Sequence, residues 1–175
     1  MPNERKHTMK TLFTFALTVL CSLAFANNVT TNWEAGIPYV DAGAKAVDQY
    51  DGDITARIVA TGTVNVAALG TYAITYNVAD ASGNAADPAV RSVVVKDTRP
   101  PVITLKGGAA IIKVARGTSA LNIPGLGATA TDSFAGPVTV LATFVPTLDT
   151  TKAGNYVCTY TAKDPSGNVA IPATQ

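Results

Sequence analysis

Short stretches in which hydrophobic and polar residues alternate follow one another along the chain after residue 26. In residues 71–79, Tyr72, Ile74 and Tyr76 alternate with small or polar residues, as in a strand with one face in a core and the other in water. The strands predicted in this way cover residues 54–60, 71–79, 89–96, 102–105, 109–115, 138–144 and 155–162. Turn-forming residues separate them, and no stretch after residue 26 keeps a helical period. The pattern therefore predicts an all-β fold built from sandwiches of short strands.

The pattern occurs twice, because residues 43–86 and 127–170 align without a gap at a constant offset of 84 residues. Most of the recurring residues are glycines, aspartates and tyrosines. Gly43, Asp48, Gly52, Gly70, Tyr72, Tyr76, Asp80 and Asn84 correspond to Gly127, Asp132, Gly136, Gly154, Tyr156, Tyr160, Asp164 and Asn168. A fixed period indicates one structural unit used more than once. We expect two tandem domains, repeat 1 over residues 27–97 and repeat 2 over residues 98–175, joined where Pro100 and Pro101 stiffen the chain.

Five motifs in a fixed order carry a resemblance to a known family. They are Gly43-Ala44-x-Ala46-x-Asp48, Asp51-Gly52-Asp53-Ile54-Thr55, Gly70-Thr71-Tyr72-x-x-x-Tyr76, Asp80-x-Ser82-Gly83-Asn84 and the closing Arg91-Ser92-Val93-Val94-Val95. Together they resemble the bacterial immunoglobulin-like (Ig-like) module described from a pesticidal crystal toxin. The resemblance implies two tandem Ig-like β-sandwich domains in an extracellular protein. It implies no catalysis, since such modules serve as spacers, stalks or binding units in surface adhesins or beside secreted enzymes.

Repeat 2 departs from repeat 1 in two ways. It has Ala135 and Pro137 where repeat 1 has Asp51 and Asp53, and the counterpart of residues 91–96 begins only at Gln175. A sandwich without its last strand exposes unpaired backbone groups and part of its core. We therefore expect repeat 2 to be incomplete, either as a fragment of a longer tandem protein or as a fold completed by a strand from a neighbouring subunit. The fragment is favoured, because the polar residues 27–32 alternate poorly and would make a weak donor strand.

Residues 1–26 have the pattern of a secretory signal peptide. Arg5, Lys6 and Lys10 precede an apolar core over residues 12–25, and Ala24 and Ala26 stand at the −3 and −1 positions of a cleavage site. The apolar core is shorter than the roughly 20 residues of a membrane span, so no membrane insertion is expected after cleavage. An uncleaved anchor is the alternative. The pattern predicts export, and hence a secreted or cell-surface protein.

Charge and cysteine content change with cleavage. The mature chain would carry ten basic and eleven acidic residues, so it lacks the basic surface that a nucleic-acid partner requires. Cys158 would be the single remaining cysteine, which excludes a disulfide within the mature chain. We expect Cys158 to be a small buried hydrophobic residue.

The residue types of the chain argue against an enzyme. The single histidine, His7, leaves with the signal peptide, so no Ser-His or Cys-His pair and no His-ligated metal can form. Carboxylate-only glycoside hydrolysis stays formally open, although nothing in the pattern indicates a substrate cleft. No catalytic residue and no organic cofactor are predicted.

One carboxylate cluster is a candidate metal site. Asp48, Asp51 and Asp53 lie in one loop of repeat 1, and an Ig-like topology could bring Asp80 and Asn84 to the same end. Hard oxygen ligands of this kind suit Ca²⁺. The alternative is ordinary turn chemistry, in which Asp and Asn beside Gly accept hydrogen bonds from their own backbone. In repeat 2, with two carboxylates replaced, any Ca²⁺ binding should be weaker or lost.

The aromatic residues favour structure over recognition. Tyr72 and Tyr156 occupy the position of the tyrosine corner of Ig domains. Tyr76 and Tyr160 are expected in the core, and Trp33 over an exposed edge of repeat 1, although an exposed Trp could stack on a sugar. The sequence thus favours a stalk, spacer or adhesive unit whose partners are other domains of a longer chain, surface proteins or glycans. The alternatives are a carbohydrate-binding accessory of a secreted hydrolase and a subunit of a surface polymer completed by strand donation.

Overall fold

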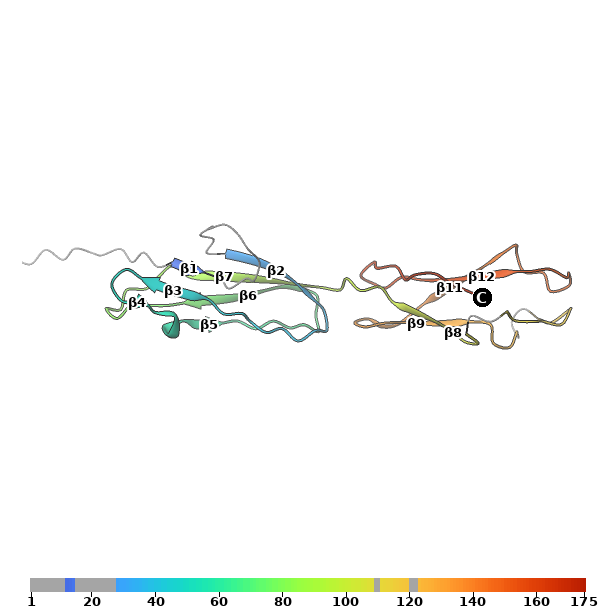
Figure 1. Cartoon of the computed structure of the whole chain (residues 1–175), viewed down its shortest axis with the longest axis horizontal. Coiled ribbons are helices and arrows are strands. Elements are labelled where there is room, and N and C mark those ends of the chain that lie inside the picture. The colour runs from blue at the N-terminus through green and yellow to red at the C-terminus, as the bar shows by residue number, and fades with distance from the viewer. Residues whose placement is uncertain (1–11, 15–27, 109–110, 120–122) are drawn as a thin grey trace, which may run out of the picture. The chain divides into compact units, whose positions relative to one another are not determined.

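The computed structural model describes residues 12–14, 28–108, 111–119 and 123–175, and it divides the chain into two compact units, Met1–Lys96 and Asp97–Gln175 (Figure 1). The predicted all-β class is confirmed, with one short 3-10 turn, η1 (Thr55–Arg57), between strands. Within these described ranges there is no helix with the length and apolarity needed to cross a bilayer. Most of the predicted signal segment lies outside the described residues. The signal peptide therefore stays a prediction.

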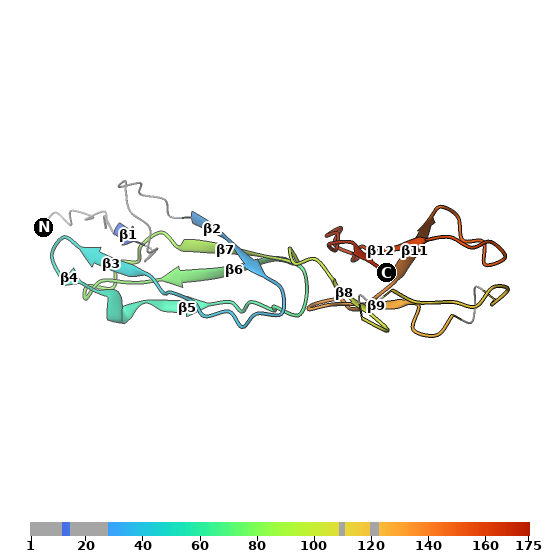
Figure 2. The same cartoon turned by 45° about the vertical axis from the view of Figure 1, so that its right-hand side comes forward.

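Unit 1 contains two sheets (Figure 2). The first has the order β1-β3-β4, formed by Leu12–Thr14, Lys45–Asp48 and Gly52–Asp53. The second has the order β2-β7-β6-β5, formed by Asn28–Glu34, Ala89–Lys96, Gly70–Asn77 and Val59–Thr61. The pairs are antiparallel except β2 and β7, which run parallel over seven residue pairs.

Unit 2 also contains two sheets. The order β10-β9-β8 comprises Gly136–Val138, Ala128–Asp132 and Val102–Leu105. The order β11-β12-β13 comprises Val140–Val145, Val157–Ala162 and Ala173–Thr174. One hydrophobic cluster takes residues from both sheets: Ala130, Ala162, Ala170, Ile103, Val138 and Val140. The two sheets of unit 2 therefore share a core.

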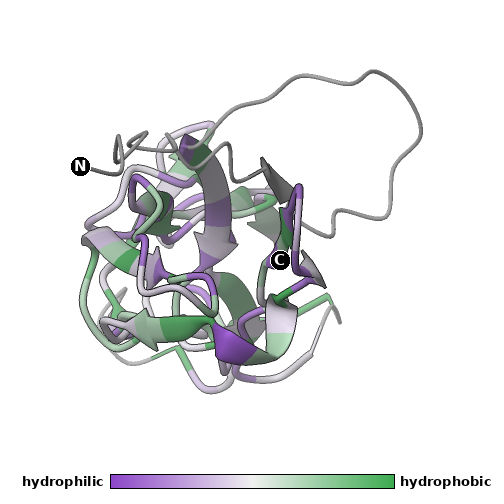
Figure 3. Cartoon of the chain, turned by 90° about the vertical axis from the view of Figure 1, so that its left-hand side faces the viewer, coloured by the Kyte–Doolittle hydropathy of each residue, from purple (hydrophilic) through white to green (hydrophobic). Residues whose placement is uncertain are grey.

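Figure 3 shows the hydropathy of each residue along the chain. In β6 and β7 the alternation predicts burial correctly. Val93 and Val95 of β7 are fully buried, and so is Tyr76 of β6. Cys158 is buried in β12, as predicted. The tyrosine corner is present in both units, because Tyr72 Oη donates to the carbonyl of Ala68 at 2.8 Å and Tyr156 Oη to that of Asp149 at 2.9 Å.

The two units share strand register as well as sequence. Tyr76 lies opposite Ala89 in unit 1, and Tyr160 lies opposite Ala173, 84 residues later, in unit 2. The N–H and C=O of Gln175 each bond to Cys158 at 2.9 Å, so Gln175 continues β13. It takes the place that Arg91 has in β7. The last strand of repeat 2 begins at Ala173, two residues before the predicted counterpart of Arg91.

Three predicted strands are wrong in part. Residues 138–144, predicted as one strand, run across the break at Thr139 between β10 and β11. Residues 54–60 contain η1 before β5, because Asp53 Oδ1 accepts the amide of Thr55 at 2.9 Å and the N–H of Arg57 bonds to the carbonyl of Ile54 at 2.9 Å. Of residues 109–115, the first two lie outside the described residues and 111–115 form no strand. Their counterparts in repeat 1 lie at the start of β2, whose partner is β7. In repeat 2 the strand that corresponds to β7 is the short β13.

Residues 27–32 alternate poorly and are predicted to be a weak donor strand for a neighbouring subunit, which the structure does not test. Within the chain, residues 28–32 form part of β2, which pairs along β7. Backbone N–H and C=O groups make the parallel pairing of β2 with β7. The weak hydrophobic alternation of β2 therefore matters less than the backbone groups that β7 exposes along its edge.

A groove of about 780 Å³ lies in unit 2 where the fold lacks this pairing. Ile111, Ile112 and Val114 line it on one side, and Phe144, Val157 and Gln175 on the other. Ile111 is 90% exposed. Part of the apolar interior of unit 2 is therefore open, and the incompleteness of repeat 2 stays a prediction.

Candidate functional site

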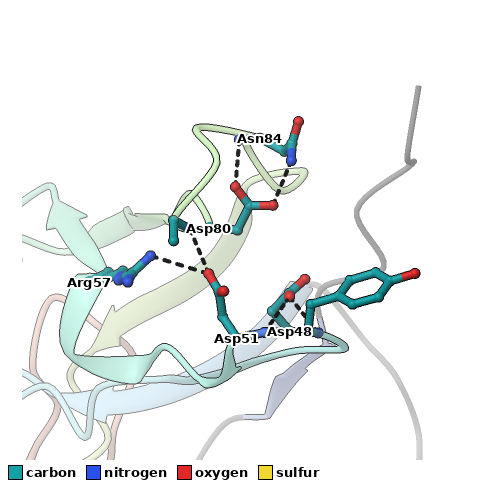
Figure 4. A network of polar contacts seen from close by, with 7 residues as sticks. Asp48, Asp51, Arg57, Asp80 and Asn84 are labelled. Atoms are coloured by element: carbon teal, nitrogen blue, oxygen red, sulfur yellow. Dashed lines mark hydrogen bonds and ion pairs between the residues drawn. The ribbon is translucent and has the colours of Figure 1, made fainter. Parts of the chain in front are cut away.

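The aspartate loops of repeat 1 form one connected polar network (Figure 4). Asp48 Oδ1 accepts the amides of Tyr50 at 2.8 Å and Asp51 at 2.9 Å. Asp51 reaches the loop that contains Asp80, where its Oδ2 accepts the amide of Ala81 at 2.6 Å and forms an ion pair with Arg57 at 3.4 Å. The two loops therefore meet at the same end of unit 1.

The second loop closes on itself. The Asp80 carboxylate accepts the amide of Asn84 at 2.8 Å and its Nδ2 at 2.6 Å. Together with Asp53, which holds Thr55, all five predicted ligands of repeat 1 take part in turn contacts. These contacts are the ones that turn chemistry requires. The calcium site of repeat 1 stays a prediction.

Hydrogen bonds set the ionisation of these carboxylates. The Asn84 side chain, opposed by desolvation and helped by nearby amides, holds the pKa of Asp80 below its ordinary value of 3.8. The amides of Asp51 and Tyr50 likewise lower the pKa of Asp48. The hydrogen bonds to both carboxylates therefore stabilise the deprotonated form.

We expect the Asp80 loop to stabilise unit 1 above about pH 4 and to lose this effect as the pH falls further. Because the folded pKa is depressed, the unfolded chain takes up its proton first, so acid favours unfolding. Melting temperatures of the full chain between pH 6 and pH 2 test this. Asp80→Asn should flatten the acid limb, whereas Asp87→Asn, at an exposed position, should leave it unchanged. Equal acid limbs in wild type and Asp80→Asn would contradict the prediction.

Repeat 2 keeps the two aspartate turns but lacks the side chains that connect them in repeat 1. Asp132 Oδ1 accepts the amides of Phe134 at 2.7 Å and Ala135 at 2.8 Å. The Asp164 carboxylate accepts the amide and Nδ2 of Asn168, both at 2.8 Å. Ala135 and Leu141 stand where repeat 1 has the Asp51–Arg57 pair.

A third acid completes a cluster that sequence reasoning missed. One carboxylate oxygen from each of Asp97, Asp132 and Asp164 lies within 4.8 Å of the other two. Among the described residues, this is the one group of three His, Cys, Asp or Glu side chains placed so closely. Asp97 was assigned to the end of repeat 1, and it belongs to unit 2. The available signal was its position three residues before the Pro100-Pro101 pair that leads into β8.

A second polar cluster lies in the interior of unit 1. Arg91, 5% exposed, forms an ion pair with Asp41 and donates Nη2 to the carbonyl of Gly43 at 2.8 Å. Tyr76 Oη donates to the same Asp41 carboxylate at 2.7 Å, and the Arg91 guanidinium lies 5.6 Å from the centroid of the Tyr76 ring. Burial first, and then the hydrogen bond to Asp41, raise the pKa of Tyr76. This cluster ties β6 and β7 to the chain before β3.

The family comparison agrees with this arrangement of strands and turns. Residues 23–95 match the family of bacterial surface protein Ig-like domains. The resemblance predicted from the sequence is thereby confirmed for this part of the chain. The matched Ig-like domain includes β2 to β7 except Lys96, and with them the Asp41–Arg91 cluster and both aspartate loops.

Two known proteins, both named hyalin, are similar to the chain in sequence. Hyalin of Lytechinus variegatus is 33% identical over 145 residues, which cover 81% of this chain and 27% of that protein. Hyalin of Strongylocentrotus purpuratus is 36% identical over 103 residues, which cover 58% of this chain and 8% of that protein. The chain thus spans about a quarter or less of the length of these relatives.

Two solved structures match the chain at lower sequence identity. The lipoprotein BT2262 from Bacteroides thetaiotaomicron is 22% identical, with a TM-score of 0.34, over 79% of this chain and 57% of that one. The CBM51-2 and INT domains of Clostridium perfringens ZmpB, solved in complex with GlcNAc, are 13% identical, with a TM-score of 0.37, over 88% of this chain and 30% of that one.

Proposed function

We propose that the chain is a non-catalytic, extracellular Ig-like module that acts as a structural stalk, spacer or adhesive unit of a bacterial secreted or surface protein. The match of residues 23–95 to a bacterial surface Ig-like domain is the observation that carries this proposal. The repeated strand register extends it to unit 2, which we propose to be a second Ig-like sandwich in tandem with the first. Its partners are then other domains of a longer chain, surface proteins or glycans.

The side chains of the described residues support a structural role. The aspartates of the loops hold turns together, and the buried tyrosines Tyr76 and Tyr160 pack in the core instead of presenting a face to a sugar. Trp33 donates Nε1 to the carbonyl of Ile37 at 2.9 Å and packs edge-on against Tyr39 at 5.0 Å between ring centroids. Tyr76 and Tyr160 are therefore inaccessible to a sugar, and Trp33 and Tyr39, both partly exposed, pack on each other. These contacts count against the carbohydrate-binding alternative, although Tyr50 is 77% exposed.

Surface labelling tests the proposal. A bacterium that expresses the full reading frame is treated with a membrane-impermeant amine reagent, and the chain should be labelled on intact cells or recovered from the medium. A chain labelled only after lysis would overturn the extracellular assignment. Saturable binding of the purified chain to a polysaccharide panel would instead favour the carbohydrate-binding accessory.

A further inference from the structure

Unit 2 encloses three carboxylates whose charges are not balanced by a basic side chain. Asp97, Asp132 and Asp164 are 7%, 3% and 4% exposed. None of the ion pairs between described residues includes them. Buried carboxylates this close repel one another and lose the hydration that water would give them. Such a cluster needs either protons or a cation.

The hydrogen bonds of the cluster leave specific oxygens available. Both carboxylate oxygens of Asp97 and Oδ2 of Asp132 are buried without a hydrogen-bond partner. Buried polar atoms in folded proteins are almost always paired, so three orphaned oxygens in one place indicate a missing partner. The partner has to be a donor or a positive ion, because every orphaned atom is an acceptor.

We propose that Asp97, Asp132 and Asp164 form a Ca²⁺ site in unit 2. The donor set is entirely carboxylate oxygen, which suits a hard cation. Calcium–oxygen distances of about 2.3–2.6 Å allow two ligands on opposite sides of the ion to lie roughly 5 Å apart, which accommodates oxygens within 4.8 Å of one another. Magnesium, with ligands at about 2.0–2.1 Å, demands near-ideal octahedral geometry and gives up its waters reluctantly, so a set of three protein carboxylates suits it less well.

The local fold holds the ligands in position without occupying them. Asp132 uses only Oδ1 to cap its turn, which directs Oδ2 inward. Asn168 connects the other two ligands, since its Nδ2 donates both to Asp164 Oδ2 at 2.8 Å and to the backbone carbonyl of Asp97 at 3.2 Å. Each Asp164 oxygen accepts one hydrogen bond and keeps a lone pair for a metal.

This assignment reverses the expectation that repeat 1 is the better calcium binder. In repeat 1 the loops are bridged by Asp51, whose Oδ2 is already held by Arg57 and the amide of Ala81. In repeat 2 that bridge is absent from the sequence, and Asp97 brings a carboxylate from the other end of the unit's chain. The site does not depend on the proposed stalk function, because it follows from the carboxylates alone.

Calcium binding to the full chain is the test. The chain is treated with EDTA, dialysed and titrated with CaCl₂ by calorimetry, and its melting temperature is measured with and without the ion. One Ca²⁺ should bind per chain. At a concentration about 100-fold above Kd the transition of unit 2 should rise by about 10 °C or more. MgCl₂ at the same concentration should give a clearly smaller shift.

Two amide variants assign the calcium effect to this cluster. Asp97→Asn and Asp132→Asn keep side-chain volume and remove charge, so both should abolish the calcium shift. In EDTA, Asp97→Asn should melt at or above the wild-type temperature, because one of three repelling charges is gone. Asp48→Asn, the counterpart of Asp132→Asn in repeat 1, should keep the full shift.

Three outcomes would overturn the proposal. The wild type could show neither calcium heat nor a calcium-dependent melting shift, which would mean that the carboxylates share protons instead. The shift could survive in both Asp97→Asn and Asp132→Asn. It could also disappear in Asp48→Asn alone, which would place the ion in repeat 1. The wild-type titration decides the first point even if a variant fails to fold.

Discussion

Replacing Asp41 with alanine is expected to lower the free energy of unfolding of unit 1 by about 3 kcal/mol. The Arg91 side chain that faces it is 6% exposed, so it would lose its carboxylate in a place that water scarcely reaches. Tyr76 Oη would lose its acceptor at the same time. We expect the low end of the range for broken buried pairs, because the Asp41 side chain itself is 26% exposed.

Urea unfolding of the full chain, followed by Trp33 fluorescence, measures this effect in unit 1. Repeat 2 supplies the control: there Gln175 and Gly125 stand in place of Arg91 and Asp41, and Gln175 Nε2 donates to the carbonyl of Gly125 at 3.0 Å. Arg91→Gln in the Asp41→Ala background should therefore recover part of the loss. A loss below about 1 kcal/mol for Asp41→Ala, the range of an exposed ion pair, would show that the pair is hydrated.

A strand added after Gln175 is expected to stabilise unit 2 by about 2 kcal/mol. The added residues repeat Ser92–Lys96, whose Val93 and Val95 are fully buried in unit 1. Burying two valines contributes about 4–5 kcal/mol, and about five new backbone hydrogen bonds contribute roughly 1 kcal/mol each. Ordering five residues opposes this with about 7–8 kcal/mol. The groove beside Ile112 and Val157 should close as the strand pairs with residues 114–118, the counterparts of Thr30–Glu34 in β2.

Thermal melting and size-exclusion chromatography of the two chains test this prediction. The control carries the same five residues with aspartate at the two positions that correspond to Val93 and Val95, which pairs by backbone alone and cannot enter the core. We expect the valine extension to raise the melting temperature and the aspartate extension to have no effect. If the unextended chain already melts at the same temperature and as cooperatively, the open edge of unit 2 contributes no instability.

The strands that sequence predicts best are those in which the residues of the strand alternate clearly between two faces. Residues 89–96 and 102–105 match β7 and β8 at both ends, because their alternation coincides with a buried face in β7 and a half-buried face in β8. Strands β3 and β9, with four and five residues, were not predicted in this way. Strand β2 could not be recognised from its own residues, since it is held by the parallel edge of β7. Residues 111–115 are the opposite case. Their apolar residues favour a strand, but they lack a partner strand in the described part of unit 2. Strand pairing depends on two segments of the chain, whereas a hydrophobic pattern describes only one of them.

The candidate site shows the same limit. The loops of Asp51 and Asp80 were placed at the same end by the Ig-like topology that the motifs imply, and Asp51 Oδ2 does accept the amide of Ala81 in the second loop. Each of these aspartates belongs to a turn with a local signature. Asp97 has no such signature. It is brought to Asp132 and Asp164 by the fold, across sequence separations that no short motif spans.

The parallel pairing of β2 and β7 determines how the first Ig-like domain would respond to mechanical load. When two neighbouring strands run in the same direction, pulling on the start of one and the end of the other slides them past each other. All seven residue pairs between Asn28 and Lys96 would then have to yield together, whereas an antiparallel pair pulled from adjacent ends opens one bond at a time. A tether between a bacterium and a surface under flow would gain from this geometry a high resistance to rupture without any additional covalent bond.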